Sequence, residues 1–127
     1  MSKEKLVPET AIQKEIMLDM SKNGNRGFRN NVGLFVTKDG RRIKTGLGNG
    51  TSDIIGFTSV EITQDMVGKR VAIFTAVEVK REKKKGSELQ EAFISFVRSM
   101  GGIAGLAWTV EMSRDLTTKI NLPNFKG

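Results

Sequence analysis

Apolar residues at helical spacing mark the first predicted element of the chain. Pro8 suits the start of a helix, and the positions that follow it at intervals of four are apolar: Ile12, Ile16 and Met20. Asn23-Gly24 is a stop signal for this helix, because Asn and Gly favour the turn that ends a helix. The pattern predicts one amphipathic helix over about residues 8–22.

The spacing then changes to that of strands. Asp39-Gly40 separates two short runs, residues 31–37 and 41–44, and Asp-Gly in this setting predicts a two-residue hairpin turn. A glycine-rich loop over residues 46–50 leads to Asp53. Two longer apolar runs predict further strands, over about residues 53–62 and 70–80.

The last third of the chain predicts a helix, a strand and a helix. Ser87 and Gln90 form a capping-box pattern, and the helix they open has an apolar stripe made of Leu89, Phe93, Phe96, Val97 and Met100. Gly101-Gly102 ends this helix. A short buried strand follows over residues 103–108, and Thr109 caps a helix over residues 110–118. The predicted fold class is α/β, a mixed sheet flanked by helices.

Composition removes several kinds of chemistry. The 127 residues, which we interpret as one domain over residues 1–127, include no Cys, His or Tyr. Thiol nucleophiles, thiolate metal sites, imidazole bases and tyrosine-linked strand transfer are therefore excluded. Only carboxylates, Lys, Arg and hydroxyls are left for catalysis.

The chain is strongly basic. Its 21 Lys and Arg against 14 Asp and Glu give a net charge of +7, which favours a polyanionic partner such as nucleic acid; a merely solvated surface is the alternative. No apolar stretch approaches the length of a membrane span or a secretory signal. We expect a cytoplasmic protein, in a bacterial or phage-infected cell, without a membrane partner.

Three charged residues, Asp53, Glu78 and Lys80, lie at the ends of apolar runs, where charge is costly unless it is paired or binds a metal. Alternation along a strand turns Glu78 and Lys80 to one face, with Val77 and Val79 turned towards a core on the other. Two carboxylates on neighbouring strands, joined by the Val79 carbonyl, would suit Mg²⁺ or Mn²⁺. Such an ion, with a lysine that orients or deprotonates water or stabilises negative charge, can hydrolyse a phosphodiester.

A Glu-x-Lys triplet alone is weak evidence. Glu82-Lys83-Lys84 is a second example in a polar setting, and Glu78 with Lys80 could equally be a strand-end charge pair that reaches solvent.

With these residues in view, the chain resembles the virus-type replication-repair nuclease (VRR-Nuc) family of the PD-(D/E)xK superfamily. Six segments carry the resemblance in the family's order: 9–13, 29–33, 50–56, 77–80, 90–93 and 101–105. It implies a restriction-endonuclease-like core, with Asp53 and Glu78 as metal ligands and Lys80 as the catalytic lysine. It also implies that Glu9 completes the metal shell and that Gln90 touches the same centre. Ser52 stands where the superfamily has Pro before the metal-binding Asp.

Two of these roles have structural alternatives. Glu9 could serve only the positive end of the helix dipole. Gln90 could serve only the capping box with Ser87, although one side chain can do both.

The resemblance also implies a homodimer that cuts branched DNA, because compact phage-type members look like dimeric enzymes for four-way junctions. Symmetric cutting of a junction needs two sites, which a two-fold dimer of a one-site domain supplies. The interface is predicted in the C-terminal half, at one or more of Phe96, Met100, Trp108 and Phe125. The alternative is that all four belong to the core of the monomer, which is the favoured interpretation for Phe96.

A series of basic and amide side chains is predicted to contact DNA phosphates: Arg26, Arg29, Asn31, Arg41, Arg42, Lys44, Arg81, Lys83, Lys84 and Lys85. The function we predict is a metal-dependent, structure-selective DNA endonuclease acting on a four-way (Holliday) junction or a flap. The alternatives are a non-catalytic nucleic-acid-binding module with a nuclease fold and a small RNA-binding protein.

Overall fold

A computed structural model describes residues 7–124 of the chain. These residues form two compact units, one ending at Thr58 and the other beginning at Ser59, and each is described here by itself. Phe125, one of the predicted interface residues, lies outside the described residues.

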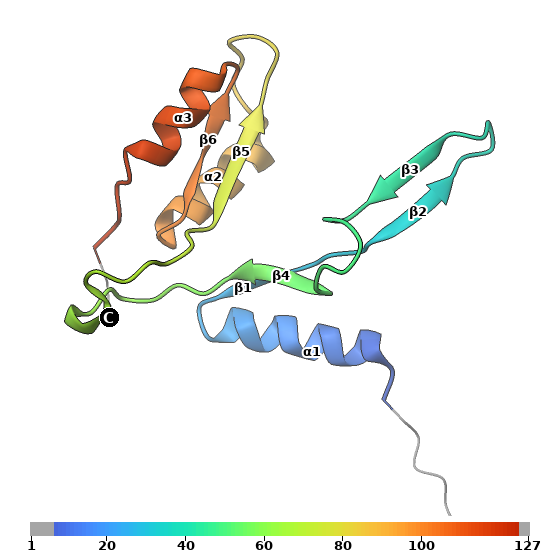
Figure 1. The fold of residues 1–127 in the computed structure, drawn as a ribbon, viewed down its shortest axis with the longest axis horizontal. Coiled ribbons are helices and arrows are strands. Elements are labelled where there is room, and N and C mark those ends of the chain that lie inside the picture. The colour runs from blue at the N-terminus through green and yellow to red at the C-terminus, as the bar shows by residue number, and fades with distance from the viewer. Residues whose placement is uncertain (1–6, 125–127) are drawn as a thin grey trace, which may run out of the picture. The chain divides into compact units, whose positions relative to one another are not determined.

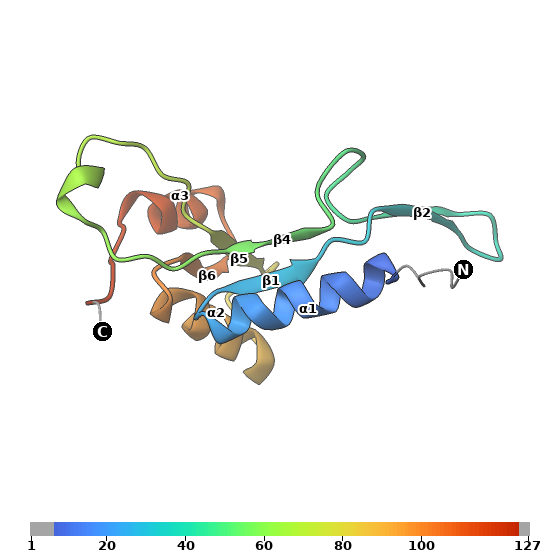
Figure 2. The ribbon, with the colours of Figure 1, turned by 90° about the horizontal axis from the view of Figure 1, so that it is seen from below.

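The first unit is built on a helix packed against a strand pair. Helix α1 (Glu9–Lys22) is followed by strand β1 (Arg26–Arg29), which pairs antiparallel with β4 (Ile54–Phe57). Helix α1 runs beside β1 (Figure 2). Gly27 permits this close approach, since a Cβ atom there would lie 2.9 Å from the Met20 sulfur. Gly56 is needed for the pair itself, since its Cβ would lie 1.9 Å from the Arg26 carbonyl oxygen.

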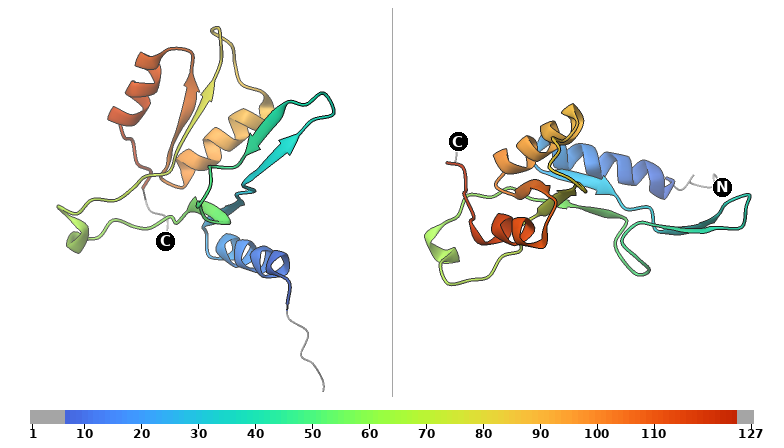
Figure 3. Two further views of the ribbon diagram at one scale, coloured as in Figure 1. Left: turned by 45° about the vertical axis from the view of Figure 1, so that its right-hand side comes forward. Right: turned by 90° about the horizontal axis from the view of Figure 1, so that it is seen from above.

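A hairpin extends from the β1–β4 pair (Figures 1 and 3). Its strands are β2 (Gly33–Val36) and β3 (Arg42–Thr45), paired antiparallel with Val36 opposite Arg42. The hairpin was predicted correctly, but the two-residue turn was wrong. Thr37 N–H donates to the Arg41 carbonyl at 2.9 Å, which leaves a loop of residues 38–40. Within this loop, Gly40 alone has a positive φ (+85°). A type I′ turn would need positive φ at Asp39 as well.

The second unit is a βαβ element with an added helix. After a short 3₁₀ helix η1 (Gln64–Met66), strand β5 (Thr75–Val79) pairs parallel with β6 (Ile103–Ala107), and α2 (Glu88–Ser99) connects them. The last helix, α3 (Val110–Thr118), begins after Thr109, whose side chain accepts from the Met112 N–H as predicted. Helices α2 and α3 lie on opposite faces of the β5–β6 pair (Figures 1 and 2).

The buried core of the second unit lies between α2 and the strand pair. Its centre is Ile94, Val97 and Ala104, with Phe74, Ala76 and Leu106 packed around them. Two predictions about side-chain direction were wrong. Leu89 is 85% exposed, because the inward face of α2 runs through Gln90, Ile94 and Val97 instead. Val79 is 73% exposed, and the buried cluster packs on the strand face that carries Ala76 and Glu78.

The predicted order of elements is confirmed, except that the observed strands are shorter and that strand β1 and the short helix η1 were not predicted. Strand β1 was not predicted, because Arg-Gly-Phe-Arg has charged ends and only one apolar residue. The fold is mixed α/β, and among residues 7–124 the strands form three two-stranded sheets. No helix in this part of the chain is long and apolar enough to span a membrane.

Candidate functional site

The second unit brings three of the predicted site residues into direct contact. Glu78 lies near the end of β5, Lys80 follows that strand, and Gln90 lies in the first turn of α2. The Lys80 ammonium donates to Gln90 Oε1 at 2.9 Å and lies 3.7 Å from Glu78 Oε1. Gln90 Nε2 donates to the same Glu78 oxygen at 2.8 Å. The predicted common direction of Glu78 and Lys80 is therefore confirmed.

The start of α2 determines how Gln90 is oriented. Ser87 Oγ accepts from the Gln90 N–H at 3.2 Å, and Gln90 Oε1 accepts from the Ser87 N–H at 2.9 Å. This is the capping box predicted from sequence. The Ser87 N–H and the Lys80 ammonium can only donate, so the atom facing both must be the amide oxygen, and the amide nitrogen turns to Glu78. One glutamine thus caps the helix and joins the two charged residues.

These contacts leave one side of Glu78 available. Both polar contacts of its carboxylate use Oε1, so Oε2 has no protein partner among residues 7–124 and can accept another ligand. The Glu78 side chain is 34% exposed and that of Lys80 is 23% exposed, so both are reached from solvent. The group is partly desolvated and still accessible, as a substrate site must be.

The first unit brings together the other two predicted carboxylates. Glu9, in the first turn of α1, and Asp53, immediately before β4, line one hollow of about 200 Å³. The remaining lining comes from the adjacent face of α1 and from β4: Ile12, Gln13, Ile16 and Ile54. The position of Glu9 at the start of α1 also suits the helix dipole, so both predicted roles remain compatible with the structure.

Asn30 braces the segment that carries Asp53, a role that sequence reasoning missed. Its side-chain amide donates to Thr51 Oγ1 and to the Ser52 carbonyl, both at 2.8 Å, and its Oδ1 accepts from the Leu47 N–H at 2.9 Å. Its own backbone N–H donates to the Asp53 carbonyl at 2.8 Å. The only sequence signal for this role is the place of Asn30 within the family-like segment 29–33.

The donor atoms in the two groups fit a hard divalent cation. Glu9, Asp53 and Glu78 supply carboxylate oxygens, which Mg²⁺ and Mn²⁺ prefer, and no softer ligand lies among them. Within residues 7–124 no three acidic side chains gather into one cluster. Glu9 with Asp53 belongs to the first unit and Glu78 with Lys80 and Gln90 to the second, so the sharing of one ion, and the Val79 carbonyl as a ligand, stay predictions.

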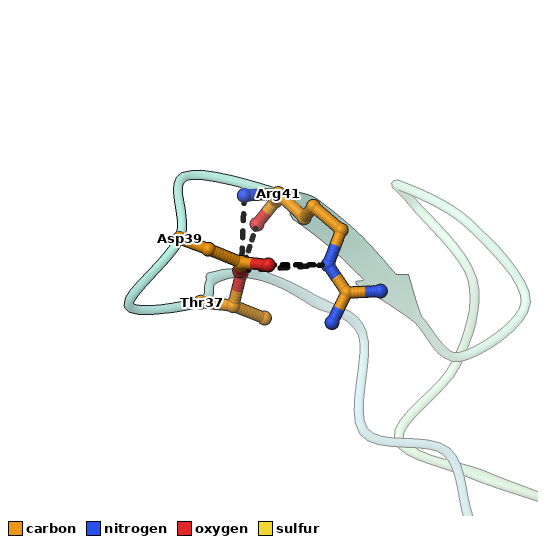
Figure 4. Close-up of polar contacts among 3 residues, drawn as sticks. All are labelled: Thr37, Asp39 and Arg41. Atoms are coloured by element: carbon orange, nitrogen blue, oxygen red, sulfur yellow. Dashed lines mark hydrogen bonds and ion pairs between the residues drawn. The ribbon is translucent and has the colours of Figure 1, made fainter.

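The basic residues predicted to contact DNA differ in their solvent exposure and in whether they form an ion pair within the protein. Arg26 is half-buried in β1, whereas Arg29, Asn31, Arg42 and Lys44 are exposed, as is the run Arg81, Lys83, Lys84 and Lys85. Arg41 is exposed, but its Nε lies 3.1 Å from Asp39 Oδ2 in the hairpin turn (Figure 4). The Thr37 hydroxyl, which donates to Asp39, and then the Arg41 guanidinium lower the pKa of the Asp39 carboxyl.

A larger hollow lies away from these residues. It measures about 520 Å³ in the second unit, between α2, β6, α3 and the segment that follows α3, and its lining includes Arg98, Asp115 and Lys119. It has a single carboxylate and contains none of the predicted site residues, so it is not the site described above.

Comparison with known proteins gives one family match. The model of the VRR-NUC domain family matches residues 12–110, a stretch that includes Asp53, Glu78, Lys80 and Gln90. No curated protein and no solved structure gives a significant match. Because the family match covers most of the chain, the protein belongs to the VRR-NUC domain family.

Proposed function

We propose that this protein is a metal-dependent, structure-selective DNA endonuclease that hydrolyses phosphodiesters in branched DNA. Membership of the VRR-NUC family indicates a nuclease-type function, and the finer assignment rests on this chain's own residues. The observation that carries it is the contact of Lys80 with Gln90 and Glu78 at the end of β5. A charged lysine beside a carboxylate with a free oxygen, at a partly exposed strand end, suits phosphate chemistry.

Asp53 and Glu78 are the proposed ligands of one Mg²⁺ or Mn²⁺ ion, with Glu9 completing the shell directly or through water. Glu9 is supported because it lines the same hollow as Asp53. Glu78 is supported because its Oε2 is free to bind while Gln90 holds Oε1. When bound, such an ion neutralises charge on the scissile phosphate and makes an attacking water more acidic.

Lys80 acts in this proposal as a fixed positive charge. Its ammonium donates to Gln90 and faces the Glu78 carboxylate, so the residue is held as a donor aimed at the site. From that position it stabilises the negative charge that develops on the phosphate oxygens in the transition state. Gln90 positions both partners, because its orientation is fixed by the helix cap.

Substrate shape is proposed from charge and composition. The net charge of +7 favours phosphate contacts, and the low aromatic content of 6% disfavours a base-stacking platform for single strands. Recognition of duplex arms around a branch fits both observations, and four-way junctions and flaps are the proposed substrates.

The test compares labelled linear, flap and four-way-junction DNA in Mg²⁺, in Mn²⁺ and in EDTA. We expect cleavage of branched DNA that EDTA abolishes. We expect Asp53→Asn, Glu78→Gln and Lys80→Ala each to lose at least a hundredfold in rate, since each removes a charge that acts in the transition state.

Glu82→Gln is the matched control for Glu78→Gln. Glu82 begins the second Glu-x-Lys triplet and is exposed, so its loss changes the net charge equally without touching the site. Parent-like cutting by any of the three site variants would remove that residue from the proposal. DNA binding without any cutting in either metal would favour the non-catalytic binding module.

A further inference from the structure

The β2–β3 hairpin has two exposed faces that differ in charge. Residues opposite one another in an antiparallel pair share a face. The register therefore places Leu34, Val36, Arg42 and Lys44 on one face, and Gly33, Phe35, Ile43 and Thr45 on the other. We call the first set the basic face of the hairpin. The opposite face carries no charge.

Neither face is used to build the core. Val36 is 66% exposed and Leu34 is 51% exposed on the basic face, while Phe35 is 61% exposed on the other. Arg42 and Lys44 are exposed and form no ion pair with any residue in the range 7–124. Two solvent-exposed cationic side chains beside exposed apolar ones are typical of a surface that binds an extended anionic partner.

The turn holds the hairpin in shape without using these cations. Thr37 donates to Asp39, the Arg41 N–H donates back to Thr37 Oγ1 at 3.0 Å, and the Arg41 guanidinium pairs with Asp39 (Figure 4). The charge of Arg41 is thus balanced by Asp39 at the tip of the hairpin. The charges of Arg42 and Lys44, two residues apart on β3, are available to a binding partner.

We infer that the hairpin enters the major groove of duplex DNA, with its basic face towards the phosphates and base edges. The major groove is about 12 Å wide and accepts a two-stranded ribbon, whereas the minor groove of undistorted DNA is only about 6 Å wide and would have to be deformed to admit one. On this arrangement Arg42 and Lys44 contact phosphates, and Leu34 and Val36 meet the apolar parts of the groove. The inference deepens the proposed function and rests on it, because it names the element that grips a duplex arm.

The experiment measures binding of a linear duplex in EDTA over a range of salt concentrations. Arg42→Gln with Lys44→Gln is compared with Lys14→Gln and Lys22→Gln, which removes the same charge from exposed positions of α1 in the same unit. We expect the hairpin variant to bind more weakly and its plot of log Kd against log salt to be shallower by about 1.8, since each phosphate contact contributes about 0.9. The α1 variant should keep the parent slope.

Groove choice is tested with small competitors. Methyl green occupies the major groove and should displace the parent protein, while the minor-groove ligand netropsin should not. Displacement by netropsin alone would contradict the inference.

The remaining outcomes separate this inference from the proposed function. Equal loss of slope in both variants, or no loss in either while the parent binds DNA, would overturn the role of the hairpin and leave the nuclease untouched. A hairpin variant that changes from dimer to monomer in sedimentation would show instead that this face joins two copies. A parent protein that neither binds nor cuts DNA would refute the function itself.

Discussion

At the scale of single residues, Asn30 is a structural support whose side chain makes no direct contact with the site chemistry. Its side chain ties Leu47, Thr51 and Ser52 together, and its backbone holds the Asp53 carbonyl. Asp53 follows a loop in which Gly46, Gly48 and Gly50 all have positive φ, a backbone conformation that glycine tolerates. We infer that Asn30 holds the backbone of Asp53 in place and so helps to orient its carboxylate.

We predict that Asn30→Ala lowers Mn²⁺ affinity and cleavage rate by about 10- to 100-fold, the usual effect of losing a residue that orients a metal ligand. Calorimetric Mn²⁺ titration and single-turnover cleavage measure the two effects. Asn23→Ala is the control, because the Asn23 side chain is also hydrogen-bonded, in its case through two bonds to Asp19 at the end of α1. Unchanged Mn²⁺ affinity in Asn30→Ala would show that Asp53 needs no such brace.

At the scale of elements, the start of α2 couples helix stability to the site. Ser87 serves only the cap, whereas Gln90 serves the cap and holds Glu78 and Lys80. We predict that Ser87→Ala lowers the free energy of unfolding by about 1 kcal/mol while folded protein keeps its activity. Gln90→Leu should lose both stability and activity, because its amide contacts to the two charged residues disappear.

Thr109→Ala is the matched cap variant, since Thr109 accepts from the Met112 N–H at the start of α3 without touching the site. Denaturant unfolding and cleavage at a temperature where all variants are folded give the two quantities separately. Gln90→Leu with full activity would reduce Gln90 to a capping residue.

The elements also show which features of the fold can be predicted from sequence patterns and which cannot. Helix α3 and the capping box were predicted because local side-chain-to-backbone bonds determine them. The predicted apolar stripe of α2 was right at Val97 but wrong in including Leu89 and omitting Ile94, because several apolar residues surround this helix and packing on β5–β6 selects among them. The hairpin turn was misjudged because Asp-Gly fits both a two-residue turn and a three-residue loop with Gly at positive φ.

At the scale of the whole molecule, sequence order identified the family but could not supply the site's geometry. Contacts close in sequence, such as Glu78 with Lys80, follow from strand alternation. The joining of Gln90 to both residues and the shared hollow of Glu9 and Asp53 depend on tertiary packing, which only the resemblance suggested.

The oligomeric state determines how many active sites the enzyme brings to one junction. One chain contains one proposed catalytic lysine, and resolving a four-way junction needs two incisions, so we propose a homodimer that makes both cuts in one encounter. Phe96, Met100 and Trp108, the predicted interface residues within the described range, are half-buried and so still offer apolar surface.

Light scattering should give twice the mass of one chain at micromolar concentration. Co-refolding parent with excess Lys80→Ala protein should then yield junctions nicked once, because mixed dimers hold one working site. Persistent paired incision in such mixtures, or a monomer throughout, would contradict the dimer.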